Sequence, residues 1–181
     1  HEGEIRNRDY NFDTYGTFIG KYDKIHIFAC DILKDGKRKK VDEGDIYSSG
    51  SEPLIIDIKG FKVGVAICFD LRFPNFLLNY YRQNVDLLTF ASAFTVPTGK
   101  AHWHTLLKAR AIEGQCYVIA PGQCGQNHPK VSTFGHSLIV NSWGEILKDA
   151  KQEEGVIIET LSKSNIQETR SRIHRDLTPN F

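Results

Sequence analysis

The sequence predicts a layered α/β (α+β) domain built around a mixed β-sheet. Two observations lead to this. In the middle of the 181-residue chain, apolar runs typical of buried strands alternate with patterns typical of amphipathic helices. On either side, short alternating runs are separated by turns that contain glycine, as in β-hairpins. The sequence contains no internal repeat, low-complexity tract or linker, so residues 1–181 are expected to form a single domain.

Residues 13–28, DTYGTFIGKYDKIHIF, are predicted to form two short strands with Gly16 at the hairpin turn. Apolar alternation continues through Ile25 and Ile27, which extends the second strand to the end of this segment. Residues 35–45, DGKRKKVDEGD, are predicted to form a solvated loop, because runs of charged residues usually face water.

Residues 54–58 and 61–68 are predicted to pair as a hairpin, with Lys59 and Gly60 at its turn. The second strand is rich in valine, isoleucine and alanine with little alternation, so it is expected to be buried on both faces. The remaining elements follow in chain order: a helix over residues 74–84, a strand over 85–94, a helix over 98–115, a strand over 116–121, a hairpin over 136–147, a strand over 155–161 and a short helix over 164–173 capped by Ser164 or Asn165.

The composition argues against nucleic acid or a membrane as partner. Lysine and arginine number 23 against 22 acidic residues, so the chain lacks the basic excess that such partners select. No apolar run is long enough to span a bilayer, and the first residues, HEGEIRNRDY, lack the basic start and apolar core of a signal peptide. Four cysteines without a Cys-x-x-Cys pair favour free thiols in the reducing cytoplasm.

Cys68 ends the apolar run FKVGVAIC, and the polar segment FDLRFP follows at once. Sites in layered α/β proteins form where strands end and helices begin, and the free N–H groups of a helix start favour a thiolate. Cys68 is therefore a candidate nucleophile, with a buried structural cysteine as the alternative. Cys30, Cys116 and Cys124 have no activating neighbour in the sequence and are expected to be structural, with Cys124 in a glycine-rich loop.

A nucleophilic cysteine needs a base or a cation nearby. His102 and His104 lie two residues apart on a helix, so they point to different faces and cannot hold one metal ion. No other spacing indicates a metal site, no organic cofactor is expected, and His136 is expected to be a hydrogen-bonded structural residue. Lys24 lies inside a strand pattern with apolar and aromatic neighbours. It is either a buried lysine that pairs with another group of a site, or a lysine on an edge strand that discourages aggregation.

Four segments resemble, in order, signature segments of the nitrilase superfamily of carbon–nitrogen hydrolases: KYDKIHIF, KVGVAICFDLRFP, ASAFTVPTGKAHWHTLLKARAIEGQCYVIAPGQCG and GHSLIVNSWGEIL. The resemblance is nearest to the omega-amidase and deaminated-glutathione-amidase-like branch. It implies an αββα sandwich, a Glu–Lys–Cys triad and hydrolysis of a non-peptide C–N bond in a small omega-amide, such as a 2-oxo-acid amide or deaminated glutathione.

The resemblance also implies roles for individual residues. Cys68 matches the nucleophile and Lys24 the catalytic lysine. Glu43 matches a second glutamate that positions groups near the lysine. The attack of a thiolate on an amide carbon makes a thioester, which water hydrolyses more easily than the amide.

The resemblance further implies how the developing negative charge and the substrate are held. The backbone N–H of Phe69 would form an oxyanion hole together with the lysine ammonium, and Ala93 and Phe94 would line the substrate pocket. A preorganised cation and N–H group of this kind stabilise the charge where water is excluded.

One part of the family pattern has no match. The general-base glutamate lies well upstream of the lysine motif in the family, and Glu2 and Glu4 lie too close to Lys24 to be that residue. We therefore expect an N-terminally incomplete sandwich that lacks the first strands, a helix and the catalytic glutamate. Such a chain needs the missing segment for full activity, and it is expected to form a homodimer or higher oligomer.

Two other functions are left open by the sequence. The first is a catalytically inactive or fragmentary homologue that acts as a subunit or module. The second is an N-carbamoyl amidase or a nitrilase of the same superfamily. A papain-like hydrolase is disfavoured, because the local signature around its cysteine is absent.

Overall fold

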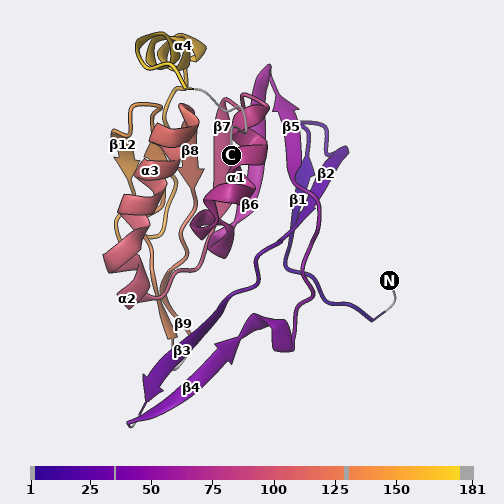
Figure 1. Cartoon of the computed structure of the whole chain (residues 1–181), viewed down its shortest axis with the longest axis vertical. Helices are drawn as coiled ribbons and strands as arrows, with labels where there is room; N and C mark the ends of the chain where they lie inside the picture. The colour runs from indigo at the N-terminus through magenta and orange to yellow at the C-terminus, as the bar shows by residue number, and fades with distance from the viewer. Residues whose placement is uncertain (1–2, 35, 129–130, 176–181) are drawn as a thin grey trace.

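The computed structural model describes residues 3–34, 36–128 and 131–175. A six-stranded mixed sheet lies at its centre, with the strand order β12-β11-β8-β7-β6-β5 (Figure 1). The strands are β5 (Leu54–Ile58), β6 (Phe61–Ile67), β7 (Leu87–Ala91), β8 (Tyr117–Ala120), β11 (Leu138–Val140) and β12 (Ile146–Asp149). The inner strands β6, β7 and β8 run parallel, whereas β5 pairs antiparallel with β6, β11 with β8, and β12 with β11.

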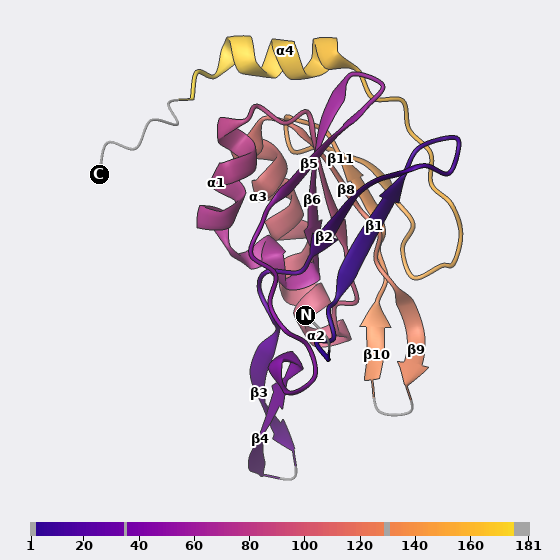
Figure 2. The ribbon, with the colours of Figure 1, turned by 90° about the vertical axis from the view of Figure 1, so that its right-hand side faces the viewer.

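Parallel neighbours require crossover connections, and helices supply them here. α1 (Pro74–Arg82) connects β6 to β7. The connection from β7 to β8 begins with the single turn α2 (Val96–Thr98) and continues through a π-helical turn (Gly99–Trp103) into α3 (His104–Gly114). Figure 2 shows α1 and α3 on one side of the sheet. Their buried side chains form one core with the apolar strands, which contributes the main stabilisation of the domain.

Three hairpins surround the sheet: β1 (Arg8–Phe12) with β2 (Phe18–Asp23), β3 (Ala29–Lys34) with β4 (Lys37–Asp42), and β9 (Cys124–His128) with β10 (Val131–Phe134). The first lies on the side of the sheet opposite α1 and α3, and Gly20 of β2 lies close to Leu54 and Ile56 of β5 (Figure 2). The second projects from the body, and a 3-10 turn (Glu43–Asp45) follows it. The C-terminal helix α4 (Lys163–Arg172) lies across one end of the sheet.

The predicted α/β class with a mixed sheet is confirmed, as are the β5–β6 hairpin and the buried strand β6. The second strand of residues 13–28 ends earlier than predicted, at Asp23. Beyond it the backbone turns away, because the N–H group of His26 donates to the buried carboxylate of Asp70 instead of to a strand neighbour.

Four further predictions are wrong. The predicted loop over residues 35–45 contains strand β4, because this charged segment pairs antiparallel with β3. Cys124 begins strand β9 rather than lying in a loop. Residues 155–161 do not form a strand, and Val156 is 86% exposed, without a core to cover it. The cap of α4 is Ser162, whose side chain accepts a hydrogen bond from the N–H group of Ser164. None of the helices in the described part of the chain has the length and apolarity needed to cross a bilayer.

Candidate active site

Cys68 lies at the carboxyl end of β6 and begins a 3-10 turn over Cys68–Arg72. Its φ of 48° is in the left-handed region, which residues other than glycine adopt uncommonly and which often marks functional positions. Because β6 is held between β5 and β7, this turn presents the thiol at the edge of the sheet from a rigid base.

A buried carboxylate holds the cysteine turn against the end of β2. Asp70 is fully buried. It accepts hydrogen bonds from the N–H group of Ile67 at 2.9 Å and from the Tyr22 hydroxyl at 2.7 Å. It also accepts from the backbone N–H of His26 at 3.0 Å and lies 2.7 Å from His26 Nδ1. Burial and the Asp70 charge raise the pKa of Tyr22, so its hydroxyl remains a donor. The cysteine turn and the lysine segment therefore share one anchor.

Lys24 follows β2 directly, and its side chain is only 1% exposed. Its ammonium donates to Oε2 of Glu43 at 2.5 Å, and the N–H group of Phe28 donates to the same oxygen at 3.0 Å. A buried ammonium requires an anionic partner, and Glu43 is that partner. The alternative of a solvent-exposed edge-strand lysine is therefore wrong.

Two adjoining cavities open on Cys68. The larger is about 330 Å³ and also touches the lysine–glutamate pair, and the smaller is about 70 Å³ and has aromatic walls. The residues of the first include Lys24, Glu43, Cys68, Ser92 and Ala93, and those of the second include Glu43, Cys68, Phe69, Arg72, Ala93 and Phe94. The structure thus brings all six site residues expected from the sequence around these two spaces.

Burial raises the pKa of the Cys68 thiol. The N–H group of Ala93, the Lys24 charge and the Ser92 hydroxyl act in the opposite direction but do not outweigh burial. The helix start that was expected to favour the thiolate does not lie at the sulfur, because α1 begins only at Pro74, beyond the 3-10 turn. A base must remove the thiol proton before the sulfur can attack a substrate.

Arg72 is a site residue that sequence reasoning missed. Its guanidinium lies over the rings of Phe69 and Phe94, 6.0 and 5.2 Å from their centroids, and one nitrogen lies 3.2 Å from His102 Nδ1. Burial lowers its pKa, and among the described residues it forms no ion pair with a carboxylate. The available signal was its position four residues after Cys68, on the same turn. The smaller cavity therefore contains a cation that can receive an anionic group.

Comparison with known proteins identifies the family of the chain. Residues 1–171 match the model of the carbon–nitrogen hydrolase family. The chain is 41% identical over 145 residues to a protein of Dictyostelium discoideum named deaminated glutathione amidase, covering 80% of this chain and 49% of that protein. It is 37% identical over 159 residues to a protein of the same name from Yersinia enterocolitica, covering 86% of this chain and 55% of that one.

Solved structures give the same result. The crystal structure of Nit3 from Saccharomyces cerevisiae, described as a member of branch 10 of the nitrilase superfamily, has a TM-score of 0.83 at 30% identity, covering 94% of this chain and 58% of that one. The NitFhit protein of Caenorhabditis elegans has a TM-score of 0.87 at 33% identity, covering 95% and 42%. The predicted nitrilase-type fold is confirmed. The chain spans about half the length of the curated relatives it matches.

Proposed function

Because the chain belongs to the carbon–nitrogen hydrolase family, we propose that it carries the nucleophile of a thiol-dependent amidase. The enzyme cleaves the amide C–N bond of a small omega-amide and releases ammonia. One observation carries this proposal: a buried lysine, already paired with a carboxylate, lines the same cavity as a cysteine at the end of a central strand. Relatives named deaminated glutathione amidase support the substrate class.

In the proposed reaction the thiol proton of Cys68 passes to a carboxylate, and the sulfur attacks the amide carbon. The carbonyl electron pair moves to the oxygen, which the Lys24 ammonium and the Phe69 N–H group stabilise. Collapse of this intermediate breaks the C–N bond, and the nitrogen takes up a proton and leaves as ammonia. Water then attacks the thioester carbon, the C–S bond breaks, and the acid and the free thiol are released.

The base is proposed to come from outside these 181 residues. Glu43 already accepts hydrogen bonds from the Lys24 ammonium and from the Phe28 N–H group, so we assign it a positioning role. A placed general base typically contributes about 10²–10⁴-fold to a rate. This chain alone is therefore expected to react slowly, and a chain that supplies the further glutamate is expected to react faster.

The substrate is proposed to be a small molecule that carries an anionic group in addition to the amide. Cavities of about 330 and 70 Å³ suit a small molecule rather than a peptide. Arg72 offers the smaller cavity a guanidinium without a carboxylate partner among the described residues. Arginine recognises carboxylates with two parallel hydrogen bonds, which favours the omega-amide of a 2-oxo dicarboxylic acid.

The test is ammonia release from such an omega-amide, by this chain and by a longer chain that includes the residues encoded upstream. Each is compared with its Cys68→Ala variant. We expect release by the longer chain, a rate at least about 10²-fold lower for this chain, and none from either variant. If neither chain released ammonia, or if Cys68→Ala changed nothing, the amidase proposal would fail and the inactive module would take its place. Preferred turnover of an N-carbamoyl amino acid or a nitrile would instead favour the other branches.

We also propose that the protein acts in the cytoplasm as a homodimer or higher oligomer. Free cysteines among the described residues support a reducing compartment. Exposed Ile112 on α3 and exposed Trp143 before β12 support association, because large apolar side chains are favourable in subunit contacts. Light scattering after size-exclusion chromatography tests the assembly, and a mass near 20.6 kDa at micromolar concentration would contradict it.

A further inference from the structure

We propose that His104, His136 and Asp149 form a binding site for a divalent transition metal ion of the zinc type. This site lies outside the candidate active site and is independent of the proposed amidase reaction. Sequence spacing gave no sign of it, since the residues belong to three separate elements. His104 begins α3, His136 lies between β10 and β11, and Asp149 ends β12.

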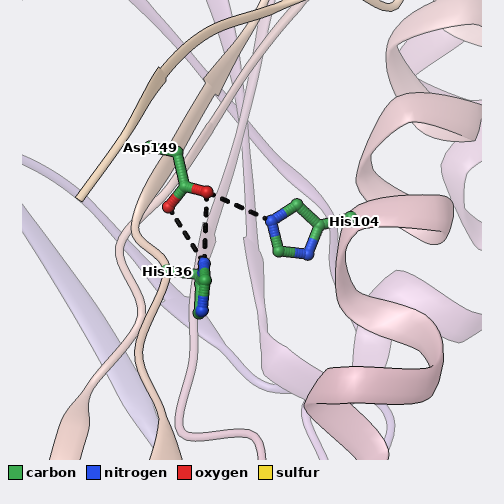
Figure 3. A group of neighbouring side chains, drawn as sticks. All are labelled: His104, His136 and Asp149. Atoms are coloured by element: carbon green, nitrogen blue, oxygen red, sulfur yellow. Dashed lines mark hydrogen bonds and ion pairs between the residues drawn. The ribbon is translucent and has the colours of Figure 1, made fainter. Parts of the chain in front are cut away.

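The donor atoms of the three side chains face one another, as Figure 3 shows. His104 Nε2 lies 3.3 Å from Asp149 Oδ2. His136 Nδ1 lies 3.0 Å from Oδ1 and 3.1 Å from Oδ2 of the same carboxylate. One donor atom from each residue can be chosen so that all three lie within 4.8 Å of one another.

These distances suit tetrahedral coordination. Zinc binds histidine nitrogen and carboxylate oxygen at about 2.0–2.1 Å, which places neighbouring ligand atoms about 3.3 Å apart. The separations of Asp149 Oδ2 from His104 Nε2 and from His136 Nδ1, 3.3 and 3.1 Å, already have about this size. Two histidines and one carboxylate leave a fourth position for water, and the partial exposure of His104 allows an ion to enter.

The second histidine is held in place by its own backbone. His136 has φ 55°, in the left-handed region, and its N–H group donates to the carbonyl of Lys151 at 2.5 Å. Its carbonyl accepts from Trp103 Nε1 at 2.7 Å, and its ring stacks on Phe134 with centroids 4.3 Å apart. Fixed orientation of a ligand by surrounding contacts is typical of metal sites and raises their affinity.

Lys151 is the competitor for the ion. Its ammonium lies 2.9 Å from Asp149 Oδ2, and its backbone N–H donates to Oδ1 at 2.7 Å. The lysine side chain is 69% exposed, so it can swing into water when an ion takes its place. Removal of this ammonium is therefore expected to preserve or strengthen metal binding. If the residues served only as ion pairs, no metal binding would be expected with or without the ammonium.

The site is connected to the candidate active site through one side chain. Trp103 donates to the carbonyl of His136, and its ring lies 4.8 Å from that of Phe94, a wall of the smaller cavity. A bound paramagnetic ion such as Co²⁺ is therefore expected to quench the fluorescence of Trp103. In a Trp143→Phe background Trp103 is the sole tryptophan, since the sequence contains two.

The experiment titrates Co²⁺ and Zn²⁺ into the chelator-treated chain, followed by visible absorption, calorimetry and Trp103 fluorescence. We expect one saturable equivalent with the visible bands of a Co²⁺ ion in a low-coordinate nitrogen and oxygen site. His104→Ala and Asp149→Ala should each weaken binding at least about tenfold, because even residues that only orient metal ligands contribute about 10–100-fold. The matched control is His102→Ala, which should bind like the unchanged chain. Lys151→Ala should bind equally or more tightly.

Circular dichroism and thermal melting establish that each variant folds, and His104→Ala is decisive because His104 is the most exposed of the three ligands. Three results would overturn the proposal: no saturable binding below about 100 μM, equal affinity in the unchanged chain and His104→Ala, or an intense thiolate-to-cobalt band alone, which would place the ion on a cysteine.

Discussion

Substitution of Asp70 by asparagine tests whether one buried carboxylate joins the cysteine turn to the lysine segment. The carboxylate has two oxygens and four donors around it. Oδ2 accepts from the Ile67 N–H and the Tyr22 hydroxyl, and Oδ1 accepts from the His26 N–H and lies against its Nδ1. An asparagine in the same place keeps one oxygen and replaces the other with an N–H₂ group.

Either orientation of the amide leaves a backbone donor without an acceptor. If the amide nitrogen faces β6, the Ile67 N–H loses its partner, and if it faces β2, the His26 N–H does. Hydrogen bonds to a charged group contribute about 1.5–3 kcal/mol, and an unsatisfied buried donor costs about 1–3 kcal/mol. Because the Tyr22 hydroxyl can rotate to accept from the amide, we expect a loss of about 2–4 kcal/mol in the free energy of unfolding.

The assay is urea denaturation followed by tryptophan fluorescence. Asp31→Asn is the control, since Asp31 lies exposed in β3 and the same chemical change there should cost less than about 0.5 kcal/mol. The alkylation rate of Cys68 is measured in parallel, because a loosened turn should alter access to the thiol. A loss for Asp70→Asn as small as that of the control would refute the anchoring role.

Four further predictions concern the residues of the two cavities. Arg72→Leu in an active longer chain should lower kcat/KM about 10–100-fold for an amide that carries a carboxylate, because one charge-assisted contact is lost. The same change should have little effect on kcat/KM for a neutral amide. Equal effects on the two substrates would contradict recognition of the carboxylate by Arg72. Glu43→Gln should lower the free energy of unfolding by about 1–3 kcal/mol. This loss is smaller than that for a fully buried ion pair, because the Glu43 side chain is 29% exposed. An unchanged denaturation midpoint would count against a stabilising pair of Lys24 and Glu43. Alkylation of Cys68 should accelerate as pH rises above the ordinary thiol range near 8.5, since burial raises its pKa and the thiolate reacts. A rate of alkylation that does not change with pH would contradict this expectation. Lys24→Met should slow the alkylation of Cys68 at every pH below the pKa of the thiol, because it removes a charge that favours the thiolate; an unchanged rate would count against that effect.

The sequence predicted most of the central sheet, because buried parallel strands and their crossover helices carry strong local patterns. It failed where the pattern was ambiguous. The charged residues of β4 look like a solvated loop, yet they pair antiparallel with β3, a contact that their own composition does not signal. Residues 155–161 look like a strand, but no neighbouring edge pairs with them in the described structure.

For the site, the signature segments were enough to select six residues that the structure then places around two cavities. The roles of Asp70 and Arg72 could not be predicted from the sequence, because they depend on partners that are distant in the chain. Tyr22 lies 48 positions from Asp70, and His102 lies 30 positions from Arg72. Long-range partners of this kind leave no periodic trace in a sequence.

The pairing of Lys24 with Glu43 also decides what the lysine can do. If Lys24 gave up its proton to act as a base, the partly buried Glu43 carboxylate would lose its counter-charge, and breaking a buried pair is strongly unfavourable. In the proposed reaction the Lys24 ammonium therefore acts on the oxyanion through its field rather than by proton transfer. Burial raises the pKa of the Cys68 thiol, and Glu43 already accepts a hydrogen bond from the Lys24 ammonium. The proposed reaction therefore calls for a second carboxylate that is not paired with the lysine and lies close to the sulfur.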